Sequence, residues 1–160
     1  MSEPFEEGTV LIVDDEDMVL TSLSSFLALE TSYEVVTFNR AQDAIAYVRE
    51  HDIDLVISDF LMPEMDGLAF LREVRALRAD VPRVILTGYA DKENAIKAIN
   101  EIGLYQYIEK PWNNEDLRLT IRNGVEKRRL VKRLNEKVAQ INEAYAELQN
   151  IQHDILKSFV

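Results

Sequence analysis

Three aspartates stand where two apolar segments of the chain end. Asp14 and Asp15 directly follow the apolar run at residues 10–13, and Asp59 directly follows the run at residues 55–58. Carboxylates that meet at one place repel one another and are driven towards protonation unless a cation neutralises them. A hard divalent ion bound through oxygen is the simplest such cation. The residue types therefore predict a Mg²⁺ site, with Mn²⁺ as the alternative ion.

Two further polar residues extend this chemistry to phosphate. Lys110 comes shortly after the apolar run at residues 105–108, and Thr87 ends the run at residues 83–87. A divalent ion attracts phosphoryl oxygens, and an ammonium offers the same group a second positive charge. A carboxylate beside them can attack phosphorus and form an acyl phosphate, to which a hydroxyl can donate a hydrogen bond. The pattern predicts phosphoryl transfer to an aspartate.

The elements that must position these residues are alternating strands and helices. The four runs above and a fifth at residues 34–38 are short and rich in β-branched residues, and the segments between them have the spacing of amphipathic helices. This alternation predicts an α/β fold with a parallel sheet covered on both faces. The length favours a doubly wound five-stranded sheet over a closed barrel, and sites in such sheets form where the strands end.

The pattern changes after Trp112. Asn113 and Asn114, followed by acidic residues, resemble a helix start, and no proline interrupts the chain afterwards. We expect one extended helix to the end, with Gly124 as its weakest point. From residue 131 apolar residues follow a heptad repeat with two seam positions. The first seam position holds Val131, Val138, Tyr145 and Gln152, and the second holds Leu134, Ile141, Leu148 and Ile155. We predict a parallel homodimeric coiled coil over residues 131–156.

Composition excludes several classes of protein. The 160 residues include 29 Asp and Glu against 18 Lys and Arg, so the net charge of -11 argues against a general nucleic-acid or membrane surface. We interpret the basic cluster of Lys127, Arg128, Arg129, Lys132 and Arg133 as a solvated helix face that does not bind DNA. The chain contains no cysteine, which excludes disulfides and thiolate chemistry. Without a signal pattern or a membrane-length apolar run, a cytoplasmic protein is expected.

Four stretches resemble the signature blocks of receiver domains in bacterial two-component response regulators. They are VLIVDDE, DLVISDFLMPEMDG, VILTGYA and YIEKPW, and the resemblance covers roughly residues 8 to 128. It implies a flavodoxin-like sheet with the strand order 2-1-3-4-5. The predicted parts are an N-terminal tail at residues 1–8, a receiver domain at residues 9–128 and a helical dimerisation segment at residues 129–160.

The resemblance also implies a metal site and a cis peptide bond. Asp15, Asp59 and the backbone carbonyl of Leu61 would bind Mg²⁺ directly, and Asp14 would act mostly through water. The peptide bond between Lys110 and Pro111 would be cis, which proline permits at modest cost.

The same resemblance implies roles in signalling. Asp59 would be phosphorylated by a sensor histidine kinase or a phosphotransfer protein, and Lys110 would pair with the phosphoryl group. Thr87 and Tyr107 would form the switch, the hydroxyl moving first and the ring following. The domain itself would be no enzyme beyond the hydrolysis of its own aspartyl phosphate. Leu61 and Tyr89, two residues past Asp59 and Thr87, are poorly suited to orienting water and predict a long-lived phosphoryl group.

Two questions stay open at this stage. Residues 15–19 also fit the D-x-D-x-[TV] pattern of haloacid-dehalogenase-type phosphatases, in which Asp15 would be the nucleophile. Against this, helical spacing begins directly after the acids, and Asp59 would have no role. The output is equally open: the last residues resemble the approach to an HD-GYP cyclic-di-GMP phosphodiesterase, with a diguanylate cyclase or a PP2C-type phosphatase as alternatives.

Overall fold

Five short apolar segments form one parallel sheet. The computed structural model describes residues 7–159. Its strands are β1 (Thr9–Val13), β2 (Glu34–Phe38), β3 (Leu55–Asp59), β4 (Arg83–Thr87) and β5 (Gln106–Glu109). Their order is β2-β1-β3-β4-β5, and every neighbouring pair is parallel. The predicted doubly wound α/β sheet with the order 2-1-3-4-5 is confirmed.

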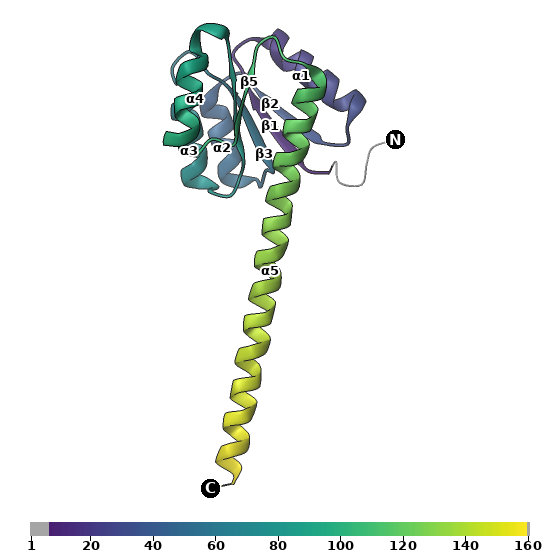
Figure 1. The fold of residues 1–160 in the computed structure, drawn as a ribbon, viewed down its shortest axis with the longest axis vertical. Helices are drawn as coiled ribbons and strands as arrows, with labels where there is room; N and C mark the ends of the chain where they lie inside the picture. The colour runs from purple at the N-terminus through teal and green to yellow at the C-terminus, as the bar shows by residue number, and fades with distance from the viewer. Residues whose placement is uncertain (1–6, 160) are drawn as a thin grey trace. The chain divides into compact units, whose positions relative to one another are not determined.

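Helices cover both faces of the sheet. They are α1 (Asp17–Glu30), α2 (Ala41–Glu50), α3 (Gly67–Leu77), α4 (Lys92–Glu101) and α5 (Asn114–Ser158), with a short 3-10 helix η1 (Tyr89–Asp91) before α4. Helices α2, α3 and α4 lie on one face, and α1 and the first part of α5 lie on the other (Figure 1). None of the helices in residues 7–159 is long and apolar enough to cross a membrane.

The two faces give the sheet two hydrophobic cores. Successive side chains of a strand point to opposite faces, so Leu11 and Val13 pack with α2, α3 and α4, while Val10 and Ile12 pack with α1 and α5. Strands β3 and β4 are buried along their whole length. Because both faces are covered, the central residues of these strands, 55–57 and 84–86, are apolar, and polar residues occur only towards the strand ends.

The chain divides into two compact units, of which the first ends at Arg128 and the second begins at Arg129. Helix α5 contributes to both of them. The predicted N-terminal tail at residues 1–8 lies mostly outside the described residues, which begin at Glu7.

Gly124 allows α5 to approach the sheet closely. A Cβ atom at this position would lie 2.7 Å from Cδ1 of Leu55 and 3.1 Å from Cε1 of Tyr105. Glycine is unfavourable in a helix by about 1 kcal/mol relative to alanine, which is why the sequence marks it as the weakest point of the helix. The helix nevertheless continues through residue 124, because the missing side chain is what permits the contact with β3.

Arg128 ends the first unit in a cluster of carboxylates. Its guanidinium donates to Asp54 at 2.8 Å, to Asp52 at 2.8 and 3.3 Å, and to Asp80 at 3.1 Å. Burial alone would lower the pKa of Arg128, but the hydrogen bonds and charges of these carboxylates outweigh it and raise the pKa. Only 5% of the residue is exposed. The interpretation of the basic cluster as a solvated face is therefore wrong for Arg128.

The contact at residue 124 predicts the outcome of a single substitution. Gly124→Ala should lower the free energy of unfolding by about 1 kcal/mol, because overpacking a core costs about 1–3 kcal/mol and exceeds the gain in helix propensity. Chemical denaturation measures the change. Asn123→Ala, at the exposed neighbouring position, is the matched control and should not destabilise the protein. A Gly124→Ala protein more stable than the parent would contradict the close packing.

Candidate functional site

The sheet brings the three predicted aspartates together. Asp14 and Asp15 follow β1, and Asp59 ends the neighbouring strand β3, whose Ser58 pairs with Val13. Carboxylate oxygens of all three aspartates lie within 4.8 Å of one another. Residues separated by more than forty positions meet here because adjacent parallel strands end at the same edge of the sheet.

Lys110 joins this cluster from the far side of β4. Its Nζ donates to Oδ1 of Asp59 at 3.1 Å and to Oδ2 of Asp14 at 3.2 Å. The backbone N–H of Lys110 donates to the carbonyl of Thr87 at 2.8 Å, which fixes the start of this segment to β4. The following peptide bond to Pro111 is cis, as the resemblance implied.

Burial and charge set the protonation of the cluster. Asp14 is fully buried and Asp59 is 8% exposed, whereas Asp15 is exposed. Burial raises the pKa of Asp14, and the N–H of Glu16 and the charge of Lys110 offset this only in part. Burial likewise raises the pKa of Asp59, with the hydrogen bond from Lys110 opposing it. Burial would lower the pKa of Lys110, but its hydrogen bond with Asp59 and the charge of Asp14 raise it.

The donor set fits a divalent cation. Three ionised carboxylates beside one ammonium leave a net charge of -2, and a divalent ion bound by oxygen would neutralise it. The exposure of Asp15 leaves one side of the cluster open to an ion from solvent. Leu61 lies two residues past Asp59 on the β3–α3 loop, with its side chain 58% exposed.

The β3–α3 loop closes back on Asp59 where α3 begins. The N–H of Gly67 donates to the carbonyl of Phe60 at 2.9 Å, and a Cβ at residue 67 would overlap the carbonyl oxygen of Asp59. Only glycine fits this approach. The N–H of Phe60 also donates to Oδ1 of Asp59 at 2.9 Å, so the first residue of the loop holds the carboxylate in place.

The two predicted switch residues lie on neighbouring strands. Thr87 ends β4, is fully buried, and donates from its hydroxyl to the carbonyl of Gly88 at 3.1 Å. Tyr107 is half-buried on β5. An ion pair that sequence reasoning missed lies close by, between Lys92 at the start of α4 and Glu109 at the end of β5, at 3.2 Å. No local spacing signals it, because the two residues meet only through the β4–β5 pairing.

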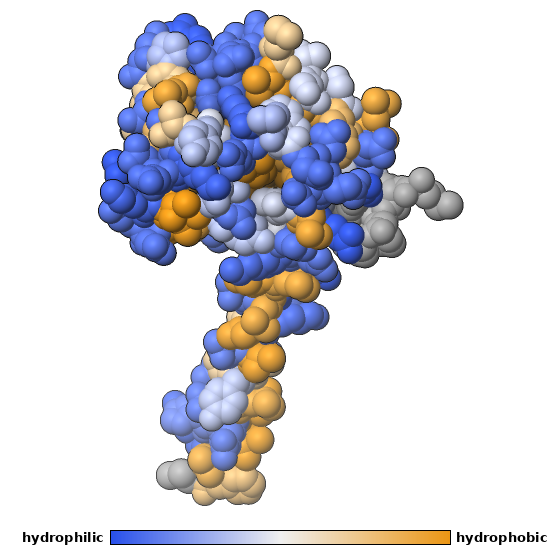
Figure 2. Space-filling view, turned by 45° about the horizontal axis from the view of Figure 1, so that its top comes forward, coloured by the Kyte–Doolittle hydropathy of each residue, from blue (hydrophilic) through white to orange (hydrophobic). Residues whose placement is uncertain are grey.

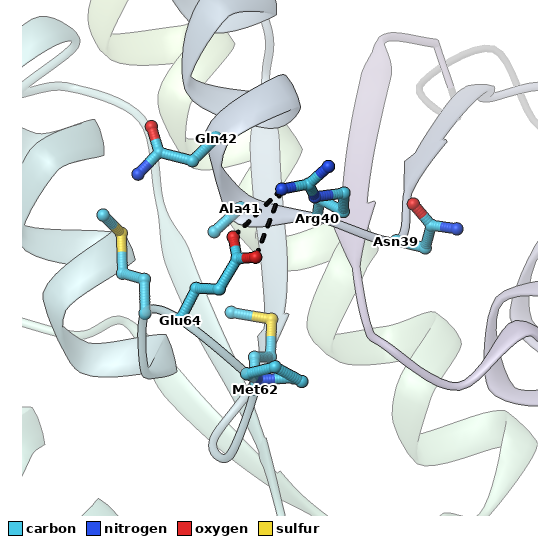
Figure 3. Close-up of a pocket in the computed structure, with 8 residues that line it drawn as sticks. Asn39, Arg40, Ala41, Gln42, Met62 and Glu64 are labelled. Atoms are coloured by element: carbon cyan, nitrogen blue, oxygen red, sulfur yellow. Dashed lines mark hydrogen bonds and ion pairs between the residues drawn. The ribbon is translucent and has the colours of Figure 1, made fainter.

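A second missed contact joins the loop after β2 to the loop after β3. Figure 3 shows Arg40 facing Glu64 across a small pocket of about 70 Å³, and Nη2 of Arg40 donates to both carboxylate oxygens at 3.2 and 3.1 Å. Glu64 has a positive φ of 69°. Both side chains are more than half exposed, so the pair contributes little to stability.

Comparison with known proteins agrees with this geometry. Residues 10–122 match the family model of the response regulator receiver domain. The chain is 36% identical over 121 residues to the hydrogenase transcriptional regulatory protein HoxA of Cupriavidus necator, covering 76% of this chain and 25% of HoxA. It is 37% identical over 123 residues to the C4-dicarboxylate transport transcriptional regulatory protein DctD of Rhizobium meliloti, covering 77% of this chain and 26% of DctD.

A solved receiver-domain structure has the same fold. The signal receiver domain of an HD domain-containing protein from Pseudomonas fluorescens Pf-5 has a TM-score of 0.71 and 31% identity, and the alignment covers 77% of this chain and 98% of that one. The fold and the acidic edge define a phosphorelay signalling domain. The chain belongs to the response regulator receiver family. It spans about a quarter of the length of the curated relatives HoxA and DctD.

The buried aspartates predict how stability depends on pH when divalent ions are removed. Because folding raises the pKa of Asp14 and Asp59, the folded state binds protons more readily than the unfolded state. Protonation of the two buried carboxyls therefore stabilises the folded state. This stabilisation is fully present below the ordinary carboxyl pKa and is lost as the pH rises through the raised pKa values of Asp14 and Asp59. Asp14→Asn should therefore be more stable than the parent at neutral pH in EDTA, and the difference should shrink towards pH 4.

Urea denaturation at several pH values measures this difference, with Asp17→Asn in the exposed first turn of α1 as the control. A parent protein that stays more stable than Asp14→Asn at neutral pH would mean that Lys110 already compensates for the burial of both carboxylates.

Proposed function

We propose that this chain is a phosphoryl-accepting switch in which Asp59 receives the phosphoryl group of a sensor histidine kinase or a phosphotransfer protein. The observation that carries the proposal is the position of the Lys110 ammonium, which lies within 3.2 Å of both Asp14 and Asp59 at the carboxyl edge of the sheet. A cation there pairs with the carboxylates before phosphorylation and with the phosphoryl group afterwards.

The contacts of Asp59 suggest which oxygen attacks. Asp59 is the aspartate at the end of β3, and its carboxylate accepts hydrogen bonds from Lys110 and from the N–H of Phe60, both at Oδ1. Oδ2 is then the nucleophile. It forms a bond to phosphorus while the bond between phosphorus and the donor imidazole nitrogen breaks, and that nitrogen keeps the electron pair.

We assign the metal site to the same edge. Asp15, Asp59 and the backbone carbonyl of Leu61 would hold Mg²⁺ directly, and Asp14 would hold it through water. When bound, the ion supplies positive charge for the phosphoryl oxygens. Buried Asp14 has a second task, because its Oδ1 accepts the N–H of Glu16 at 2.9 Å and so fixes the start of α1 beside the site.

The switch would begin at Thr87. Its hydroxyl donates to Gly88 in this structure, and turning it towards a phosphoryl group on Asp59 would exchange a neutral acceptor for a charged one. The movement would leave space next to β5, into which the ring of Tyr107 follows. The Lys92–Glu109 pair flanks this path and would have to adjust, since it ties α4 to β5.

The output of the switch lies in the paired helices and in a domain beyond them. We propose that residues 131–156 form a homodimer that relays the state of Asp59. An HD-GYP phosphodiesterase is the favoured output, supported by the similarity to the receiver of an HD domain-containing protein. HoxA and DctD are transcriptional regulatory proteins, and the similarity to them favours a transcriptional output as the second candidate. In neither case does the receiver itself act as an enzyme on another substrate.

Phosphorylation tests the proposal directly. After incubation with Mg²⁺ and acetyl phosphate, the intact mass of the parent should increase by one phosphoryl group, because Asp59 offers a nucleophile beside a cation site. Asp59→Asn should remove the modification completely, and Asp15→Asn should reduce it at least tenfold. Asp43→Asn, an exposed carboxylate on α2, is the control and should behave as the parent.

The same experiment separates the phosphatase alternative. Helix α1 begins at Asp17, so no insertion separates the acids from the helix. Modification that persists in Asp59→Asn but disappears in Asp15→Asn would nevertheless make Asp15 the nucleophile and contradict the proposed function.

The lifetime of the phosphoryl group is a second prediction. Leu61 and Tyr89, which are 58% and 85% exposed, are large and carry neither a carboxylate nor an amide, so they are poorly suited to orienting an attacking water. The double variant Leu61→Asn with Tyr89→Glu should therefore lose phosphate about tenfold faster than the parent. The decay of the phosphorylated mass after removal of acetyl phosphate measures the rate. Leu119→Asn, another exposed leucine, controls for general effects, and an unchanged decay in the double variant would refute the idea.

A further inference from the structure

The second unit exposes an apolar seam along its whole length. Seven of its eight seam residues are apolar or aromatic, and the six among them that are Val, Leu or Ile are 44–66% exposed. Figure 2 shows these side chains gathered into one stripe on the segment after residue 128. Every residue from 130 to 159 is exposed, so no part of residues 7–159 covers the seam. A heptad repeat of this length requires a partner helix.

The composition of the seam fits a second copy of this chain. Val131 and Val138 at the first seam position, with leucine at residues 134 and 148 of the second, match the pattern of two-stranded coiled coils. Ile141 and Ile155, the other two residues of the second position, do not follow that pattern, so the number of strands is measured by sedimentation. The flanking positions normally choose partners through charge. Here the eight flanking residues contain a single charge, Lys137; they are Leu130, Asn135, Lys137, Asn142, Ala144, Gln149, Ile151 and Leu156. No charge pattern selects a different chain.

Two alignments of two copies would bury the whole seam. In a parallel pair in register, each seam residue faces its own copy. In an antiparallel pair centred on residue 143, Val138 faces Leu148 of the other copy and Gln152 faces Leu134. Both alignments bury the same apolar side chains, so the hydrophobic effect does not choose between them.

Gln152, the one residue of the seam that is neither apolar nor aromatic, makes the two alignments differ in free energy. In the parallel pair its amide meets the same amide of the second copy, and each can donate to the other. In the antiparallel pair it is buried against Leu134, and a buried amide without a partner is costly. We propose that Gln152 fixes two copies of this chain in a parallel, in-register pair. This deepens the homodimer of the proposed function and rests on it.

One observation opposes this alignment. Lys132 and Arg133 lie near the start of the segment, and Glu143, Glu147 and Asp154 follow later, so an antiparallel pair would bring opposite charges closer. All five lie at outward positions of the heptad, where exposed charges are screened by salt and interact weakly. The unpaired amide at the seam therefore outweighs them.

Single cysteines test the orientation, since the chain has none of its own. Val138→Cys and Leu148→Cys are made in the full chain, with one of the two carrying a tag that changes its mass. Residues 138 and 148 are about 15 Å apart along a helix, well beyond the Cα separation that a disulfide spans. In a parallel pair each variant therefore cross-links to itself, and a mixture gives no 138–148 product.

The opposite result overturns the proposal. Cross-links only between Val138→Cys and Leu148→Cys would show an antiparallel pair, and a chain that stays monomeric in sedimentation and forms no cross-link would show that the seam has another occupant. A chain that cross-links in parallel but takes no phosphoryl group at Asp59 would contradict the proposed function alone.

The role of Gln152 itself needs a second variant. With Gln152→Leu in the cysteine pairs, mixed 138–148 products, absent from the parent seam, should form beside the parallel ones, because the amide no longer penalises the antiparallel pair. Gln140→Leu, at an outward position, is the matched control and should leave the products parallel. Gln152→Asn should also stay parallel, since its amide can still pair. Exclusively parallel products from Gln152→Leu would show that another residue sets the orientation.

Discussion

The placement of negative charge at the buried edge of the sheet is the constraint on which the rest of the structure depends. Asp14 and Asp59 are held where water cannot reach them fully, at the ends of adjacent parallel strands, and burial raises the pKa of both. Lys110 lowers the free-energy cost of burying these two carboxylates because its ammonium pairs with both of them. The remaining negative charge makes the edge receptive to a cation, and through it to a phosphoryl group.

At the opposite edge of the sheet the buried charge is positive. Arg128 is buried where the strands begin, and three aspartates from the segments before β3 and β4 surround its guanidinium. Asp54 uses its other oxygen to accept the N–H of Thr9 at 2.9 Å, so the start of β1 joins the same cluster. Each edge thus holds three carboxylates and one cation, and the two differ in burial. Asp52 and Asp80 have side chains that are 47% and 54% exposed, so water solvates the charge that Arg128 leaves unpaired. Asp14 and Asp59 are buried, so the charge that Lys110 leaves unpaired favours a bound cation.

The two units differ in what stabilises them. In the first unit, strands buried on both faces bring distant residues together, and a close approach such as that at Gly124 leaves no room for a side chain. In the second unit all contacts are local, and every apolar side chain of the seam stays exposed. A helix of this kind gains most of its stability from packing against another helix. The first unit therefore has a core of its own, whereas a helix packed on the seam would stabilise the second.

The sequence by itself determined the order of strands and helices, the edge at which Asp14, Asp59, Thr87 and Lys110 gather, and the heptad seam. It could do so because each of these follows from periodicity or from the rule that parallel strands end together. Only the tertiary structure decided that Arg128 is buried, that Gly124 is a contact, and that Lys92 pairs with Glu109 and Arg40 with Glu64. Those partners lie far apart in the chain, and the same residue types at the same spacings would be solvent-exposed on an isolated helix or loop.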